Sequence, residues 1–229
     1  MTMDLSTYAT IVFDCDGVVL NSNSIKTDAF YKATMPWGEA AANAFVDFHV
    51  SNGGISRYKK FKYFLDSIAP KHALNMFAGK RGPIIEELLN TYAEQVRAGL
   101  MTCAIADGLQ ELRAATRNAT WLIVSGGDQA ELREIFHLRG LDHFFNGGIF
   151  GSPDSKDWIL KREIAFGLIR NPAIFLGDSR YDYKTSRQVG LDFIFISGWS
   201  DVVDWPLFLR DNNLLHVKTL ADLNPTMKT

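Results

Sequence analysis

The chain has 229 residues, 47% of them hydrophobic and 22% charged, and its 24 Lys and Arg against 26 Asp and Glu give a formal net charge of -2. These values are typical of a folded globular protein, exclude disordered and fibrous classes, and supply no general attraction for nucleic acid or anionic lipid. The length suffices for one large domain or for a core with a smaller module.

The first predicted element is a short buried strand at residues 10–14. An uninterrupted apolar run, Ile11 to Phe13, is closed there by Asp-Cys-Asp-Gly, a pattern typical of a buried strand that ends in a turn. The carboxylates of Asp14 and Asp16 therefore come at the carboxyl end of this strand. Aspartate is also a common turn residue, so this pair by itself leaves a plain turn and a functional site as alternatives.

The next part of the chain contains helical patterns and no convincing strand. Apolar residues recur at helical spacing over 58–68 and over 85–96, which predicts two amphipathic helices. Pro83 stands near the start of the second helix and Gly99 is expected just past its end, as helix boundaries favour. We therefore expect an inserted all-helical cap at residues 21–100.

Four further apolar runs predict strands in the remainder of the chain, at residues 121–124, 173–176, 193–196 and, more weakly, 214–217. Helical patterns lie between these runs, and such alternation favours a parallel sheet with helices on both faces. The predicted fold is an α/β, Rossmann-like core of residues 1–20 and 101–229 that carries the inserted helical cap.

Polar side chains follow several of the predicted strands. Ligands of an open parallel sheet bind outside the carboxyl ends of its strands, so we expect one cluster to contain Asp14, Asp16, Ser125, Gly126, Lys156, Asp178 and Asp182. Carboxylates held this close repel one another unless a cation neutralises them. Magnesium accepts one or two carboxylates and shares phosphate oxygens with a substrate, so Asp14 and Asp178 are predicted magnesium ligands. With Lys156 and backbone amides to hold an anion, the set suits phosphoryl transfer.

Four motifs together resemble the haloacid dehalogenase-like superfamily, most closely its phosphatase and phosphomutase branch with a helical cap. They are "DCDGVV" at Asp14, "IVSGG" at Ser125, the single residue Lys156, and "GDSRYD" at Asp178. They follow the family's order and cover nearly the whole chain. The dehalogenase and phosphonatase branches lack a carboxylate at the position of Asp16, so the resemblance implies phosphate-ester chemistry.

The resemblance implies a role for each aspartate. Asp14 would be the nucleophile that forms an aspartyl phosphate. Asp16 would be the general acid and then the general base, and its backbone carbonyl would be a metal ligand. Asp178 would complete the magnesium site, and Asp182 would hold a metal-bound water or orient Lys156.

The resemblance also implies how the substrate would be held. Ser125 and the amide of Gly126 would bind the transferring phosphoryl group, and Lys156 would steady that group and the nucleophile. The cap would close over the site and supply residues that select the substrate. In its stretch "SNGGISRYKKFKYF", Arg57 is the candidate substrate contact, with a solvated helix surface as the alternative place for this basic residue.

The predicted function is therefore a magnesium-dependent phosphatase, a phosphoric monoester hydrolase that acts on a small phosphorylated metabolite such as a sugar phosphate or sugar acid phosphate. A phosphomutase with the same motifs is the alternative. A non-catalytic phospho-aspartate signalling or binding protein is the third possibility, which the length of the chain and its helical insertion disfavour.

Location and partners follow from what the sequence lacks. Cys15 and Cys103 are too few for a disulfide framework, and the first residues, "MTMDLSTYAT", carry no export signal. Apolar runs stay short of the ~20 residues of a membrane span. We expect a cytoplasmic protein with no membrane or nucleic-acid partner, and its oligomeric state is left open.

Overall fold

The computed structural model describes residues 4–72 and 82–223. At its centre is a sheet of six parallel strands in the order β3-β2-β1-β4-β5-β6. The strands are β1 (Thr10–Phe13), β2 (Thr120–Asp128), β3 (Gly148–Ser152), β4 (Ala173–Gly177), β5 (Asp192–Ile196) and β6 (Leu215–Val217). The predicted parallel α/β sheet is confirmed.

Strand β3 was not among the five strands that the sequence predicts. Its five residues, "GIFGS", include two glycines, which weaken the apolar signal and disfavour a strand interior. It forms because it pairs with β2 at the edge of the sheet, with Ile149 beside Ile123 and Phe150 beside Val124. Pairing with a distant segment is not visible in a local pattern.

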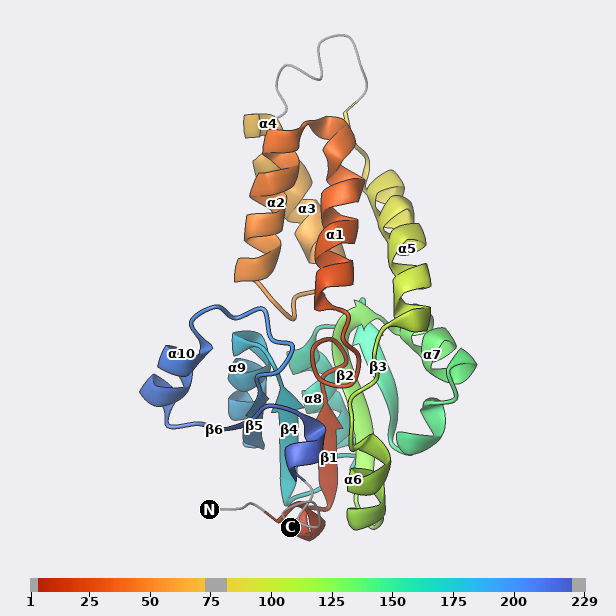
Figure 1. Ribbon diagram of the computed structural model, residues 1–229, viewed down its shortest axis with the longest axis vertical. Helices are drawn as coiled ribbons and strands as arrows, with labels where there is room; N and C mark the ends of the chain where they lie inside the picture. The colour runs from red at the N-terminus through yellow and green to blue at the C-terminus, as the bar shows by residue number, and fades with distance from the viewer. Residues whose placement is uncertain (1–3, 73–81, 224–229) are drawn as a thin grey trace.

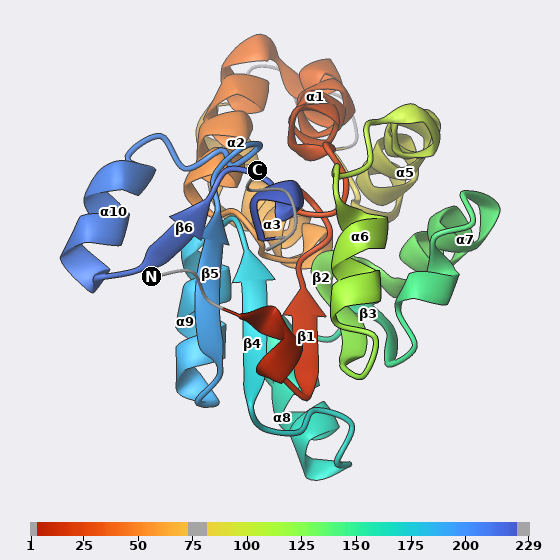
Figure 2. The ribbon, with the colours of Figure 1, turned by 60° about the horizontal axis from the view of Figure 1, so that its bottom comes forward.

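Helices cover both faces of the sheet, as Figure 2 shows. Ile11 and Phe13 of β1 face one apolar cluster and Val12 between them faces the other, as the two-residue period of a strand requires. The first cluster includes residues of α6 (Leu109–Ala115) and α7 (Gln129–Leu138). The second includes residues of α8 (Lys156–Ala165) and α10 (Trp205–Asn212), with Tyr183 of α9 (Arg180–Gln188) against it.

A layer of helices lies over the carboxyl ends of the strands (Figure 1). These helices are α1 (Asn23–Thr34), α2 (Glu39–Ser51), α3 (Arg57–Tyr63), a π-helical turn (Phe64–Ile68), α4 (Ala69–His72) and α5 (Ile85–Thr102). We call them the cap. They pack around an aromatic cluster that contains Phe30, Phe45 and Phe61. No helix among the described residues is both long enough and apolar enough to span a membrane.

One predicted helix boundary is wrong. Gly99 lies inside α5, which continues to Thr102, and does not follow its end. A Cβ atom at Gly99 would lie 2.5 Å from Cγ2 of Ile25 on α1. The glycine therefore allows α5 to approach α1 closely, a role that depends on the neighbouring helix and not on helix termination.

Candidate active site

Asp14 lies directly after β1 and is paired with a buried lysine. Lys156, the first residue of α8, places its Nζ 2.8 Å from Oδ2 of Asp14 and 2.5 Å from Oδ1 of Asp182. All three residues are buried. Burial alone would lower the pKa of Lys156, but the two carboxylates raise it above its ordinary value, so the side chain is an ammonium.

Asp182 connects this pair to α9. Its Oδ2 accepts hydrogen bonds from the backbone N–H and the hydroxyl of Ser179, at 3.1 and 2.6 Å, and completes a capping box at the start of the helix. Its other oxygen accepts from Lys156. Asp182 therefore caps α9 and orients Lys156 at the same time.

Three carboxylates gather around one point. Asp14, Asp178 and Asp182 each offer an oxygen, and these atoms lie within 4.8 Å of one another. Burial, followed by the charges of neighbouring aspartates, raises the pKa of Asp14 and of Asp178. The single charge of Lys156 cannot balance three carboxylates, so a bound cation would relieve their repulsion. A set of hard oxygen donors fits magnesium.

A glycine turn brings the end of β1 against the end of β4. Gly17 has a φ of +74°, and a Cβ atom there would lie 2.0 Å from Oδ2 of Asp178. The same oxygen accepts a hydrogen bond from Nδ2 of Asn23 at 2.9 Å. Any side chain at position 17 would therefore displace Asp178 in addition to straining the turn.

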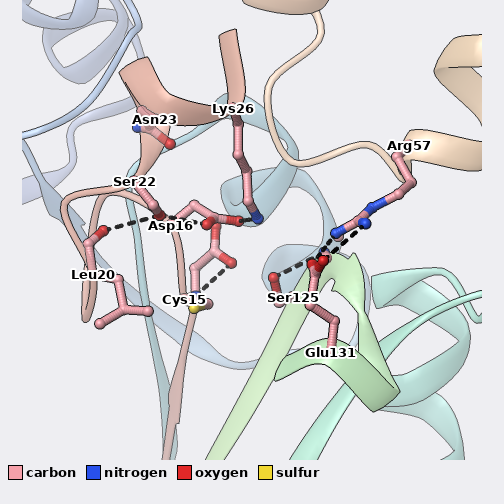
Figure 3. A network of polar contacts seen from close by, with 12 residues as sticks. Cys15, Asp16, Leu20, Ser22, Asn23, Lys26, Arg57, Ser125 and Glu131 are labelled. Carbon is pink, nitrogen blue, oxygen red and sulfur yellow. Dashed lines mark hydrogen bonds and ion pairs between the residues drawn. The ribbon is translucent and has the colours of Figure 1, made fainter. Parts of the chain in front are cut away.

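Asp16 is held by two groups that the sequence did not single out (Figure 3). Nζ of Lys26 on α1 lies 2.5 Å from Oδ2 of Asp16, and the Ser22 hydroxyl donates to Oδ1 at 2.6 Å. Burial would raise the pKa of Asp16, but Lys26 and Ser22 outweigh it and hold the pKa below its ordinary value. Asp16 is therefore a carboxylate in this conformation. A lone lysine on a helix gives no sequence signal for such a contact.

The predicted phosphate-binding residues Ser125 and Gly126 lie inside β2 and not after it, because the strand continues with a shift in register to Asp128. This part of β2 lies against the cap. The hydroxyl of Ser125 accepts a hydrogen bond from the Gly127 amide at 3.0 Å. A Cβ atom at Gly126 would lie 2.4 Å from the carbonyl oxygen of Gly54, in the loop before α3. Glycine at position 126 therefore permits the cap loop to rest directly on the core.

Cap and core line a cavity of about 60 Å³ that is partly open to solvent. Of the predicted site residues, Asp14, Asp16, Asp178, Gly126 and Arg57 line it. Ser125, Lys156 and Asp182 are buried outside its lining. The cap adds lining residues that were not predicted, namely Asn23, Lys26, Phe30, His49, Lys60 and Tyr92.

Arg57 is buried, with 6% of its surface exposed, so the alternative of a solvated helix surface is wrong. Its guanidinium pairs with both carboxylate oxygens of Glu131 on α7, as Figure 3 shows. The next residue, Tyr58, donates a 2.7 Å hydrogen bond to Asp128. Both contacts join the cap to the core.

Lys60 is a buried lysine of the cavity wall that contacts a histidine. It is 2% exposed, and its Nζ lies 2.6 Å from Nδ1 of His49. Burial, and then the charge of Lys26, lowers the pKa of Lys60 to about 7. Burial and Lys60 lower the pKa of His49 to about 2, so the imidazole is neutral. Lys60 lies in the stretch "SNGGISRYKKFKYF", where the sequence analysis expects substrate selection, whereas His49 lies outside every segment that the sequence singled out.

Comparison with known proteins places this geometry among hydrolases. A family model described as haloacid dehalogenase-like hydrolase matches residues 8–190. No curated protein matches the sequence.

Solved structures with the same fold cover almost the whole chain. A predicted phosphoglycolate phosphatase from Haemophilus somnus is 17% identical, with a TM-score of 0.67 over 94% of this chain and 96% of its own. A haloacid dehalogenase-like family hydrolase from Streptococcus pneumoniae is 19% identical, with a TM-score of 0.62 over 92% and 94%. A phosphonoacetaldehyde hydrolase-like protein from Oleispira antarctica is 12% identical, with a TM-score of 0.71 over 96% and 91%.

Proposed function

Because this chain belongs to the haloacid dehalogenase-like hydrolases, we propose that it is a magnesium-dependent phosphatase acting on a small phosphorylated metabolite, such as a sugar phosphate or sugar acid phosphate. The observation that carries the proposal is the cluster of Asp14, Asp178 and Asp182 around the Lys156 ammonium. Several structural neighbours are described as phosphatases, which agrees with this reading.

The proposed reaction has two steps that share one nucleophile. A carboxylate oxygen of Asp14 attacks phosphorus, the bond from phosphorus to the ester oxygen breaks, and Asp16 in its acid form gives its proton to the leaving oxygen. Water then attacks the aspartyl phosphate and loses a proton to Asp16. The bond between phosphorus and Asp14 breaks, which releases inorganic phosphate and restores the Asp14 carboxylate.

The main requirement of these steps is to neutralise the negative charge of the phosphoryl group. Asp14, Asp178 and the backbone carbonyl of Asp16 would hold magnesium, which when bound neutralises negative charge on the phosphoryl oxygens. Lys156 orients the Asp14 carboxylate, and Asp182 orients Lys156. The Ser125 hydroxyl and the Gly126 amide are proposed to bind the phosphoryl oxygens.

Lys26 sets the protonation state of the proposed acid–base residue. The ion pair with Lys26 keeps Asp16 ionised, which is the form that accepts a proton from water. To protonate a leaving group, Asp16 must first gain a proton. Its contact with Lys26 must also be replaced by a contact with the substrate. Lys26 belongs to the cap, which we propose spans residues 21–100. The position of the cap therefore affects whether Asp16 is ionised.

Replacement of the nucleophile tests the proposal. We expect Asp14→Asn to lower kcat for phosphate release at least ~10³-fold, because an amide cannot form the aspartyl phosphate. The measurement is inorganic phosphate released from a panel of small phosphate esters with magnesium. Asp211→Asn, at an exposed residue of α10, is the matched control and should keep the wild-type rate. An Asp14→Asn protein with the wild-type rate would rule out the assignment.

The same assay separates the phosphatase from a phosphomutase. A mutase returns the phosphoryl group to the sugar, so a sugar monophosphate incubated with a bisphosphorylated sugar would be converted to its isomer with little free phosphate. A phosphatase yields phosphate in proportion to the ester consumed.

A further inference from the structure

We propose that Asn23, the first residue of helix α1, is the positioning residue of Asp178 and that its amide orients this carboxylate for magnesium. The inference rests on the proposed magnesium-dependent phosphatase and adds a cap residue to its metal site. It is carried by the two hydrogen bonds of Asn23, by the scarcity of other partners for Asp178, and by a glycine that leaves room for the contact.

Asp178 has the fewest partners of the three clustered carboxylates. Asp14 and Asp182 both pair with Lys156, whereas no cation in the described part of the chain pairs with Asp178. The only side chain of the described residues that hydrogen-bonds to its carboxylate is Asn23, whose Nδ2 donates to Oδ2 at 2.9 Å. Asp178 is buried. The orientation of its carboxylate therefore depends on Asn23.

The Asn23 amide is itself held in one orientation. A side-chain amide nitrogen carries two N–H donors, and the same Nδ2 also donates to the carbonyl oxygen of Trp199 at 2.8 Å. A carboxylate and a carbonyl oxygen both accept, so the nitrogen of the amide and not its oxygen must face them. Trp199 follows β5, and Asp178 follows β4. Asn23 therefore joins the ends of two neighbouring strands.

Gly17 leaves the space that this contact needs. A Cβ atom at position 17 would lie 2.0 Å from Oδ2 of Asp178 and 2.6 Å from Nδ2 of Asn23. These are the two atoms of the hydrogen bond. A side chain larger than hydrogen would push them apart, so the turn after β1 accommodates the contact between Asn23 and Asp178.

A neutral donor suits a metal ligand. A lysine in this place would repel the metal cation, and a further carboxylate would add to the repulsion among the aspartates. The amide of Asn23 fixes the carboxylate of Asp178 without adding charge. An ionised carboxylate has about four acceptor positions, so one hydrogen bond leaves the others for a cation. Asn23 therefore acts on the metal through its ligand.

The first turn of α1 supports two residues of the proposed site. Ser22 and Lys26 bind the carboxylate of Asp16, and Asn23 binds that of Asp178. Figure 3 shows Ser22, Asn23 and Lys26 on this turn. The start of the cap is thus in contact with both the proposed acid–base residue and a proposed metal ligand.

The test measures the metal affinity of the full-length protein. Isothermal titration calorimetry with magnesium chloride, after treatment with a chelator, gives the Kd. Asn23→Ala removes the amide, and Asn23→Leu keeps a side chain of similar shape without a donor. Each should raise the Kd for magnesium about 10- to 100-fold, the range for loss of a hydrogen bond to a metal ligand. Either variant decides the question if the other fails to fold by circular dichroism.

Calcium separates orientation from a general loss of affinity. Magnesium demands near-octahedral geometry, whereas calcium tolerates irregular placement of its oxygen ligands. Loss of an orienting hydrogen bond should therefore raise the Kd for magnesium by a larger factor than the Kd for calcium. Asn212→Ala is the matched control, because it removes a 2.9 Å hydrogen bond from an asparagine amide to the carbonyl oxygen of Phe208, outside the site. It should leave both Kd values unchanged.

The failures of the two proposals differ. A magnesium Kd that stays at the wild-type value in a folded Asn23 variant would overturn the positioning role and leave the metal site standing. A rise by the same factor for both ions would also overturn it, because orientation affects magnesium more. A wild-type protein that binds no magnesium would instead refute the metal dependence in the proposed function, and this inference would fall with it.

Discussion

At the scale of single residues, the site is defined by buried charges that do not balance. Lys156 pairs with two carboxylates and Lys26 pairs with Asp16. Lys60 pairs with no carboxylate among the described residues. Each imbalance shifts a pKa, because burial removes the water that would otherwise stabilise the charge. The magnesium ion that we propose would balance the excess of carboxylates near Asp14.

At the scale of elements, close helix packing in the cap depends on one glycine. Gly99 faces Ile25, and the space for a Cβ atom is absent. Elsewhere in a helix, alanine is favoured over glycine by about 1 kcal/mol. Here an added methyl group must displace α1 or the Ile25 side chain, and overpacking of this kind costs about 1–3 kcal/mol.

Gly99→Ala should therefore lower the free energy of unfolding in urea by about 1 kcal/mol, the difference between the overpacking cost and the propensity gain. Ala98→Gly, at the exposed neighbouring position of α5, calibrates the propensity alone and should also cost about 1 kcal/mol. Combining Gly99→Ala with Ile25→Ala should cost less than the sum of the two single changes, because the methyl group then has room. A stabilised Gly99→Ala protein would contradict this packing.

At the scale of the whole molecule, the site exists because segments far apart in the chain meet at one edge of the sheet. Asp14 follows β1, Asp178 follows β4, and Lys156 begins α8. The cap closes the same edge through the pairs of Lys26 with Asp16 and of Arg57 with Glu131. A ligand that binds this junction binds only the folded protein and must stabilise it.

Magnesium should therefore raise the melting temperature. At a concentration ~100 times its Kd the gain is about 2.7 kcal/mol, which corresponds to roughly 5–10 °C for a chain of this size. Asp178→Asn should abolish the gain. Without metal, this variant should be at least as stable as the wild type, because one of the repelling carboxylates is gone.

Differential scanning calorimetry with and without magnesium measures both effects. Asp211→Asn, which removes an exposed carboxylate outside the site, should keep the full gain. An equal gain in Asp178→Asn would exclude Asp178 as a ligand.

The sequence by itself determined the α/β class, the parallel sheet and the family. These depend on local signals: apolar runs, helical spacing and motif residues that directly follow strands. The same signals singled out Asp14, Asp16 and Asp178 after predicted strands, and Lys156 in a loop ahead of a predicted helix.

Only the tertiary structure decided which partners the buried charges find. The edge strand β3, the place of Gly99 inside α5, and the contacts of Lys26, Lys60 and Arg57 all depend on segments distant in the chain. A lysine in a helix has the same local sequence pattern whether its side chain lies in solvent or in a cavity. Its environment, and with it its pKa and its possible ligand, is set by what packs against it.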